Sequence, residues 1–232
     1  MASAAYIMVF DDLQQSAVDL GNPETLIFDY VQRIGAVIDR MPAGPLRAVH
    51  IGGAAMSLPR YIHAKRPGST QVVFEPSHEV VEQVRAEAPL PPRSGIKVRE
   101  VPGQDGIIDL KASFYDLVIL DAFDRGHVPV ALTTAEFIAH VRRVLVPGGV
   151  LIANLVDRKP FHRIRSFVAS ARDLGRLAIG VEAATMKGRR DGNFVIACGE
   201  LSKTPFGHPS PVEYKVFTGQ ALFDSFGGGT PL

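Results

Sequence analysis

Short apolar runs alternate with amphipathic segments along most of this chain. The runs have the length of buried strands, and they cover 48–51, 71–74, 96–101, 115–120 and 150–155. Apolar residues at helical spacing occupy most of the intervals between them. Strands that alternate with helices are typical of a mostly parallel sheet with helices on both faces. With a closing pair of strands at 177–181 and 193–198, the sequence predicts an α/β fold whose sheet has about seven strands.

Two flanking segments divide the 232-residue chain. Residues 1–44 predict a short N-terminal extension of one strand and one helix, with Asn22 as the helix N-cap and Pro23 in its first turn. Residues 45–200 form the predicted central domain. Residues 201–232 are rich in Pro and Gly, and their aromatic side chains predict a tail that packs on the body or on a partner. The apolar N-terminal helix and this tail also favour a homodimer.

Composition argues against several classes of function. The formal net charge is +1, which favours neither nucleic acid nor an anionic membrane surface as a partner. No apolar run approaches the roughly 20 residues of a membrane-spanning helix, and no secretory signal is visible. The single cysteine, Cys198, cannot build a disulfide or a zinc site, and the histidines lack ligand spacing. We therefore expect a cytoplasmic protein without a metal.

Two carboxylates mark the end of the apolar run at 115–120. Asp121 closes this run, and Asp124 follows in the loop. In open α/β sheets, ligands bind beyond the carboxyl ends of the strands, which makes both residues candidates for a site. In the alternative interpretation, Asp121 only ends the strand and Asp124 caps a turn.

A glycine pair, Gly52 and Gly53, follows the strand at 48–51 and precedes a helix. Glycines at this point let a ligand approach the backbone, and the helix N-terminus offers free N–H groups. The strict dinucleotide fingerprint G-x-G-x-x-G is absent, which disfavours a pyrophosphate cofactor. A simple tight turn accounts for the pair equally well.

Two further acidic residues follow neighbouring strands. Glu75 ends one strand, where an acidic side chain can accept hydrogen bonds from both ribose hydroxyls of a nucleoside. Asp105, followed by Gly106, comes after the next strand and is placed to hold an adenine amino group. Each also has a plain interpretation as part of a turn. Together with the glycine pair they fit an adenosine site without phosphates, which points to an S-adenosyl sulfonium compound.

An adenosyl sulfonium is a cation that is activated for displacement at carbon. An amine nucleophile must lose a proton to attack it, and a carboxylate at hydrogen-bond distance can accept that proton. Two carboxylates in one desolvated pocket also attract cationic substrates. Asp121 and Asp124 therefore suit a small-molecule amine as the acceptor.

These motifs resemble the spermidine synthase (polyamine aminopropyltransferase) family over about residues 9–198. The most specific part is Leu120-Asp121-Ala122-Phe123-Asp124, with Pro129, Leu132 and Glu136-Phe137 beyond it. The segment Val9–Ser16 is similar to the family's hairpin, which leads to a substrate-contacting glutamine, here Gln15. Tyr30 falls where the family has a tyrosine of the polyamine site.

The resemblance implies a Rossmann-like, methyltransferase-like fold. It also implies transfer of an aminopropyl group from decarboxylated S-adenosylmethionine to a diamine such as putrescine, with methylthioadenosine as product. By this resemblance Asp124 is the general base and Asp121 an anchor for the amine, while Glu75 holds the ribose and Asp105 the adenine. The resemblance also implies contacts to the donor from Gly52, Gly53, Gly106 and Gln15. It implies a contact to the acceptor from Tyr30.

Two positions depart from the family's pattern. The family's glycine-rich loop carries an aspartate for the aminopropyl ammonium, where this chain has Ala55, and Met186 stands where a second tyrosine is expected. Ala55 and the basic stretch Lys187–Arg190 leave open a methyltransferase that uses S-adenosylmethionine itself. A non-catalytic nucleoside-binding or interaction protein on the same scaffold is the third interpretation.

Overall fold

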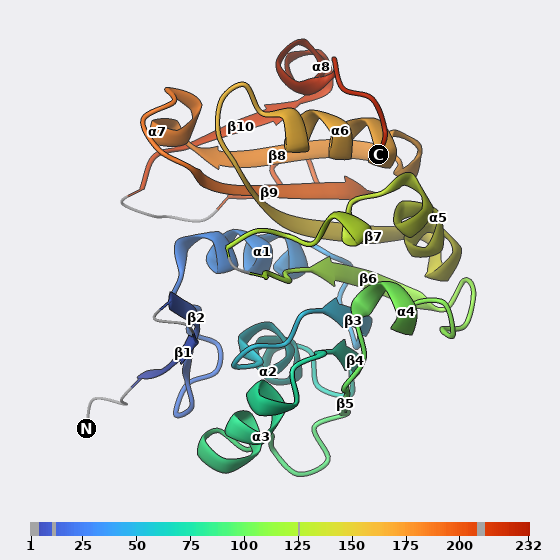
Figure 1. The fold of residues 1–232 in the computed structure, drawn as a ribbon. Helices are drawn as coiled ribbons and strands as arrows, with labels where there is room; N and C mark the ends of the chain where they lie inside the picture. The colour runs from blue at the N-terminus through green and yellow to red at the C-terminus, as the bar shows by residue number, and fades with distance from the viewer. Residues whose placement is uncertain (1–4, 11–12, 125, 208–211) are drawn as a thin grey trace.

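The computed structural model describes residues 5–10, 13–124, 126–207 and 212–232. The main sheet contains β3 (Arg47–Ile51), β4 (Thr70–Phe74), β5 (Ile96–Arg99), β6 (Tyr115–Leu120), β7 (Leu145–Asp157), β8 (Arg176–Glu182), β9 (Gly192–Gly199) and β10 (Tyr214–Thr218). Within the described residues these form one eight-stranded sheet in the order β10-β8-β9-β7-β6-β3-β4-β5 (Figure 1). The predicted α/β fold with a mostly parallel sheet is confirmed.

The register of the parallel strands brings three strand ends to the same level. Strands β3 to β7 run parallel, whereas β8, β9 and β10 pair antiparallel. Ile51 at the end of β3 pairs with Phe74 of β4 on one side and with Leu120 of β6 on the other. The residues that follow these three ends therefore meet at one edge of the sheet.

The predicted closing pair corresponds to β8 and β9, which do pair, but neither of them lies at the edge of the sheet. The edge strand is β10, which comes from the segment predicted as a tail. This strand is only 5 residues long, and only two of them are even half-buried. Such a short edge strand has too little alternation to be recognised in a Pro- and Gly-rich stretch.

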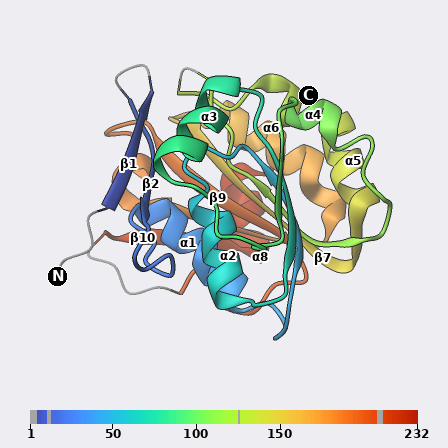
Figure 2. The same cartoon turned by 90° about the horizontal axis from the view of Figure 1, so that it is seen from below.

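Helices cover both faces of the sheet (Figures 1 and 2). The first face is covered by α1 (Asp29–Asp39), α2 (Ser57–Lys65) and α3 (His78–Glu87). The second face is covered by α4 (Gly103–Gly106), α5 (Ala135–Val144), α6 (His162–Ala171) and α8 (Gly219–Phe226), while the short α7 (Ala183–Met186) follows β8. The apolar face of α1, one of the features that favoured a homodimer, packs on the sheet of its own chain.

The residue pattern predicted a single strand in the N-terminal extension, but the segment contains a hairpin, as the resemblance of Val9–Ser16 to the family's hairpin implied. Strands β1 (Ala5–Phe10) and β2 (Leu13–Asp19) form a separate two-stranded antiparallel sheet beside the main body (Figure 2). Residues 11 and 12, which fall within the predicted hairpin segment, lie outside the described residues. Ser16 pairs with Met8 and Gln14 with Val9, so the backbone of Gln15 is the extra residue at an irregularity in the pairing.

The prediction of Asn22 as a helix N-cap is wrong, because α1 begins only at Asp29. The backbone N–H of Asn22 donates a hydrogen bond to the carboxylate of Asp19 at 3.0 Å. Leu26 then forms an isolated bridge with Val18 of β2. Asn22 and Pro23 thus belong to the turn that connects the hairpin to the first helix.

The tail packs on the body through α8. Phe226 is completely buried, and its ring lies 5.8 Å from that of Phe161, 6.0 Å from that of Phe194 and 5.2 Å from that of Phe217, between centroids. These residues come from α6, β9 and β10 and their flanks. The tail therefore contributes to the core on the second face of the sheet.

We expect Phe226→Ala to lower the free energy of unfolding by about 3–5 kcal/mol, because it removes a buried ring and leaves a cavity. Phe223→Ala is the matched control on the same helix, since 38% of Phe223 is exposed. Its loss should be clearly smaller. Urea unfolding followed by circular dichroism measures both values, and equal losses would contradict a core role for α8.

Candidate functional site

A cavity of about 410 Å³ opens where the carboxyl ends of β3, β4 and β6 meet. The predicted site residues on its wall are Tyr30, Gly52, Gly53, Glu75, Asp121 and Asp124. They come from α1 and from the segments that follow three different strands. The fold thus brings together residues that are far apart in the sequence.

Gly52 holds the ends of β3 and β6 together. Its φ is +94°, and a Cβ at this position would lie 2.3 Å from the carbonyl oxygen of Asp121. The N–H of Asp121 in turn donates to the carbonyl oxygen of Ile51 at 2.9 Å. Any side chain at residue 52 would push the two strand ends apart, so this glycine is required by packing as well as by any ligand.

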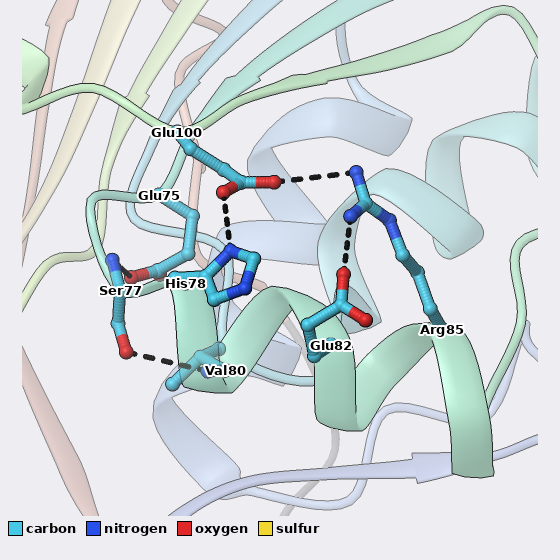
Figure 3. A network of polar contacts seen from close by, with 7 residues as sticks. All are labelled: Glu75, Ser77, His78, Val80, Glu82, Arg85 and Glu100. Atoms are coloured by element: carbon cyan, nitrogen blue, oxygen red, sulfur yellow. Dashed lines mark hydrogen bonds and ion pairs between the residues drawn. The ribbon is translucent and has the colours of Figure 1, made fainter.

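Glu75 is held in place by backbone amides. One carboxylate oxygen accepts hydrogen bonds from the N–H groups of Gly53 at 3.0 Å and Ala54 at 3.3 Å. The other oxygen accepts the N–H of Ser77 at 3.1 Å, and the Ser77 hydroxyl caps α3 at Val80 (Figure 3). The carboxylate therefore links the glycine loop to the start of α3, and it also lines the cavity.

A second group of polar contacts near Glu75 joins α3 to the end of β5. Glu100 contacts His78 at 2.8 Å and Arg85 at 3.3 Å (Figure 3). The hydrogen bond from His78 lowers the pKa of Glu100, and Glu100 raises the pKa of His78. These side chains are largely exposed, so the pairs add little stability. Their position keeps the loop after β5 close to α3, and both segments border the cavity.

Asp121 is a half-buried acid, and one side chain among the described residues donates a hydrogen bond to it. The side-chain amide of Asn154, on β7, donates to Asp121 Oδ1 at 2.9 Å. Burial raises the pKa of Asp121 to about 6, although the Asn154 hydrogen bond opposes this shift. Burial raises the pKa of the Tyr30 hydroxyl, and the charge of the nearby Asp121 raises it further. Asp121 can therefore hold or release a proton near neutral pH.

Asp124 occupies a more open position in the loop after β6. Its side chain is exposed, and its backbone pairs with His127 through hydrogen bonds of 2.8 and 3.0 Å. This backbone pairing fixes the residue at the mouth of the cavity. The two carboxylates thus lie in different environments, since Asp121 is half-buried and Asp124 is exposed.

Three predicted cofactor contacts are placed less clearly. Asp105 lies on the exposed side of the one-turn helix α4, and its neighbour Gln104 lines the cavity instead. Gly106 is packed against the ring of Phe74, where a Cβ would lie 2.3 Å away. The side chain of Gln15 lies outside the described residues.

Three polar residues near the cavity were not singled out from the sequence. Ser16 and His50 line it, with 6% and 2% of their surface exposed, and the fully buried Asn154 supports Asp121. His50 and Asn154 each interrupt an otherwise apolar strand, and this interruption is the feature of the sequence that could have identified them. A polar residue in a buried strand needs a partner or a function.

The described wall of the cavity carries negative charge and no lysine or arginine. Its ionisable acids are Glu75, Asp121 and Asp124. Ala55 is completely buried, together with Met56, in an apolar cluster, so this loop supplies no carboxylate. Met56 also adopts a φ of +59°, a region that favours glycine. The cavity is therefore suited to a cation, and the carboxylates that suit it come from segments other than the glycine-rich loop.

The second departure from the family's pattern lies outside the cavity wall. Met186 is half-buried and packs against the core on the second face of the sheet. The basic stretch after it is exposed, and Arg190 forms an ion pair with Glu182.

Comparison with known proteins bears on this site. No family model matches the chain. A polyamine aminopropyltransferase of Chromobacterium violaceum is 28% identical over 141 residues, which is 60% of this chain and 53% of the relative. A polyamine aminopropyltransferase of Vibrio vulnificus is 42% identical over 45 residues, 19% of this chain and 15% of the relative. The first match spans about half the length of that curated relative.

Solved structures show the same relationship over nearly the whole chain. A probable spermidine synthase from Corynebacterium glutamicum superimposes with a TM-score of 0.88 and 25% identity, covering 98% of this chain and 88% of the other. In sequence and in fold, this chain is similar to polyamine aminopropyltransferases and spermidine synthases. Human methyltransferase-like protein 13 in complex with SAH has a TM-score of 0.61 at 20% identity, covering 81% of this chain and 86% of that one, which shows the shared fold.

Two further observations concern the described part of this chain. No group of three or more His, Cys, Asp or Glu side chains there is arranged to hold a metal ion. None of the helices there combines the length and the apolar character that crossing a bilayer requires.

We expect Asp121→Asn to stabilise the folded protein at pH 8. Burial raises the pKa of this carboxyl from 3.8 to about 6, so the folded state binds its proton more tightly than the unfolded state does. Ionisation of Asp121 therefore destabilises the fold as the pH rises through about 6, and this cost is absent below about pH 4. The gain at pH 8 should be on the order of 1–3 kcal/mol, falling toward zero at pH 4.

Urea unfolding at both pH values measures this difference, with exposed Asp109→Asn as the control. An equal change at pH 8 and pH 4 would show that the carboxyl group of Asp121 is not perturbed. Other groups that titrate in this range affect the wild type and the variant alike, so they cancel in the comparison.

Proposed function

We propose that the protein is an aminopropyltransferase, which moves an aminopropyl group from decarboxylated S-adenosylmethionine to a diamine such as putrescine and releases methylthioadenosine. The observation that carries this proposal is the cavity at the strand ends, which presents Glu75, Asp121 and Asp124 and no lysine or arginine among its described lining residues. Both substrates are cations. The curated relatives named above and a spermidine synthase in complex with the transition state analogue AdoDATO support the assignment.

The nucleoside end of the donor belongs at Glu75. Its carboxylate is fixed at the start of α3, where it can accept the ribose hydroxyls. The glycine pair leaves room for the donor against the backbone, and Gln104 lines the same cavity. Asp105, Gly106 and Gln15 remain predicted donor contacts.

The acceptor amine attacks the methylene carbon next to the sulfonium sulfur. The nitrogen lone pair forms the new C–N bond, the C–S bond breaks, and its electron pair stays on sulfur as a neutral thioether. The amine must lose a proton to a base before or during this step. The proton remains on a carboxylate until water accepts it.

We assign the base role to Asp121 rather than to Asp124, which reverses the assignment implied by the resemblance. A base is most effective when its pKa lies near the working pH, and burial raises the pKa of Asp121 to about 6. Asp124 is exposed at the mouth of the cavity and suits the task of attracting and anchoring the cationic amine. Tyr30 lies on the acceptor side, close to Asp121.

Ala55 keeps a second candidate function open. Without an aspartate in the glycine-rich loop, the donor's ammonium lacks the counter-charge that the family provides there, so a methyltransferase using S-adenosylmethionine is the alternative. The absence of lysine and arginine from the described cavity wall counts against it, because that donor retains a carboxylate. A homodimer and a cytoplasmic location also remain predictions.

Calorimetric titration with methylthioadenosine, decarboxylated S-adenosylmethionine and S-adenosylmethionine separates these functions. We expect the first two to bind and the third to bind more weakly. Tight binding of S-adenosylmethionine alone would favour a methyltransferase, and binding of none would favour an interaction protein.

Transfer to putrescine tests the roles of the two carboxylates. We expect Asp121→Asn to reduce kcat by roughly 10²–10⁴-fold, because general base catalysis contributes this much, while methylthioadenosine binding is retained. Asp124→Asn should mainly raise the KM for putrescine, by about tenfold or more. If Asp124→Asn abolishes kcat while Asp121→Asn does not, the assignment of the base is wrong.

A further inference from the structure

Basic side chains gather on the surface formed by residues 157–163 and 182–191, which we call the basic patch. The first segment leads from the end of β7 into α6, and the second contains α7 and leads into β9. The lysines and arginines of the patch are all exposed, and they are Arg158, Lys159, Arg163, Lys187, Arg189 and Arg190. None of these six lines the cavity described above. The patch is therefore a surface feature that the proposed chemistry does not use.

The fold places the two segments side by side. Asp157, the last residue of β7, pairs with Gly192, the first residue of β9, and paired strands lie about 4.8 Å apart. A Cβ on Gly188 would lie 3.1 Å from Cδ of Lys159, so the second segment touches the first. Two stretches that are separated in the sequence thus form one continuous surface.

Hydrogen bonds to the backbone hold both segments in fixed turns. The carboxylate of Asp157 accepts the N–H groups of Arg158 at 2.8 Å and Ile164 at 3.1 Å, which orders the loop before α6. In the second segment, the N–H of Gly188 donates to the carbonyl oxygen of Thr185 at 2.8 Å. The basic side chains therefore extend from an ordered backbone, which reduces the entropy that a bound partner would cost.

The acids of the patch neutralise only part of its charge. Arg190 forms an ion pair with Glu182, and Arg158 lies 4.0 Å from Asp191. The cations of the patch that form no ion pair within the described part of the chain are Lys159, Arg163, Lys187 and Arg189. Half of the patch's positive charge or more is thus available to a partner.

The net charge of the whole chain hides this local excess. The two segments together contain six lysines and arginines and three carboxylates, an excess of three positive charges, whereas the chain as a whole has +1. The remaining residues therefore carry an excess of two negative charges. The composition argued against nucleic acid as a partner only through the average, and a partner meets the local charge.

The side chains of the patch select among anionic partners. The described residues that expose a large hydrophobic side chain all lie outside it. A surface that enters a membrane inserts apolar side chains, and a protein interface has an apolar or aromatic centre. The only phenylalanine of the patch, Phe161, is buried, and the patch has no tyrosine or tryptophan on which unpaired bases could stack. Lysine and arginine alone suit the phosphates of a duplex.

We propose that the basic patch binds the phosphate backbone of double-stranded nucleic acid without reading its sequence. The four cations without an ion pair contact phosphates, and the counterions that leave the duplex supply most of the binding free energy. The inference does not rest on the proposed function, because the basic side chains of the patch lie outside the cavity wall.

Fluorescence anisotropy of a labelled DNA duplex tests the patch on the full chain, at salt concentrations from about 50 to 200 mM. Four phosphate contacts predict that the logarithm of the binding constant falls with the logarithm of the salt concentration with a slope of about −3.6. Lys187→Gln combined with Arg189→Gln should change this slope to about −1.8, since each cation accounts for about one phosphate. Binding at the lowest salt concentration should weaken by at least about tenfold.

The matched control is Arg93→Gln combined with Lys97→Gln. It removes the same charge from exposed residues before and in β5, at the other end of the sheet from β9. This variant should keep the affinity and the slope of the wild type. Equal losses in the two double variants would show attraction by the molecule as a whole and would overturn the patch. A wild type that binds no duplex at the lowest salt concentration would also overturn it.

Two further titrations complete the test. Vesicles of phosphatidylglycerol present the other common anionic surface, and binding to these vesicles without binding to the duplex would contradict the proposal. Methylthioadenosine should bind the wild type and both double variants equally, which shows that the variants are folded. A wild type that binds the duplex but not methylthioadenosine would contradict the proposed function and support the patch.

Discussion

The close contact between the ends of β3 and β6 is the constraint on which the site depends. Gly52 has no side chain and a positive φ, so its backbone can lie against the carbonyl of Asp121, and the Asp121 amide hydrogen-bonds back to Ile51. This contact fixes where the acid leaves the sheet. It also directs the glycine loop toward Glu75, whose carboxylate then holds two amides of that loop. One small residue thus sets the relative positions of the nucleoside end and the reactive end of the cavity.

Burial of Asp121 lowers the stability of the folded protein and raises the proton affinity of this carboxylate. The acid is partly removed from water and, among the described side chains, receives one hydrogen bond, from Asn154. This is enough to orient the carboxylate, but not enough to compensate its desolvation, and its affinity for a proton rises accordingly. Destabilising the ionised form in the folded state is the same physical effect that makes it a better base.

The sequence predicted the fold class and the positions where strands end, because both follow from apolar periodicity and from short acidic or glycine-rich breaks. It predicted one strand where the chain has a hairpin, and it missed β10, since short strands at an edge bury too few side chains to leave a pattern. Asn22, followed by Pro23, has the residue type of a helix start. Its backbone N–H instead donates a hydrogen bond to the carboxylate of Asp19, in a turn.

For the site, strand ends and residue types identified five of the six predicted residues on the cavity wall, and the family resemblance supplied Tyr30. The residue pattern could not rank Asp121 against Asp124. Their difference in burial depends on the loop conformation and on a residue of another strand. His50 and Asn154 left a signal as polar residues in apolar runs, but their roles depend on which strand lies next to them, and Ser16 left no such signal.

The amides around Glu75 have a consequence for the order of events in nucleoside binding. Three N–H groups already hold both carboxylate oxygens before any nucleoside arrives. The side chain has therefore lost its rotamer freedom during folding, and the ribose meets an acceptor that needs no further ordering. Recognition of the sugar is to that extent a property acquired when the polypeptide folds rather than when it encounters its substrate.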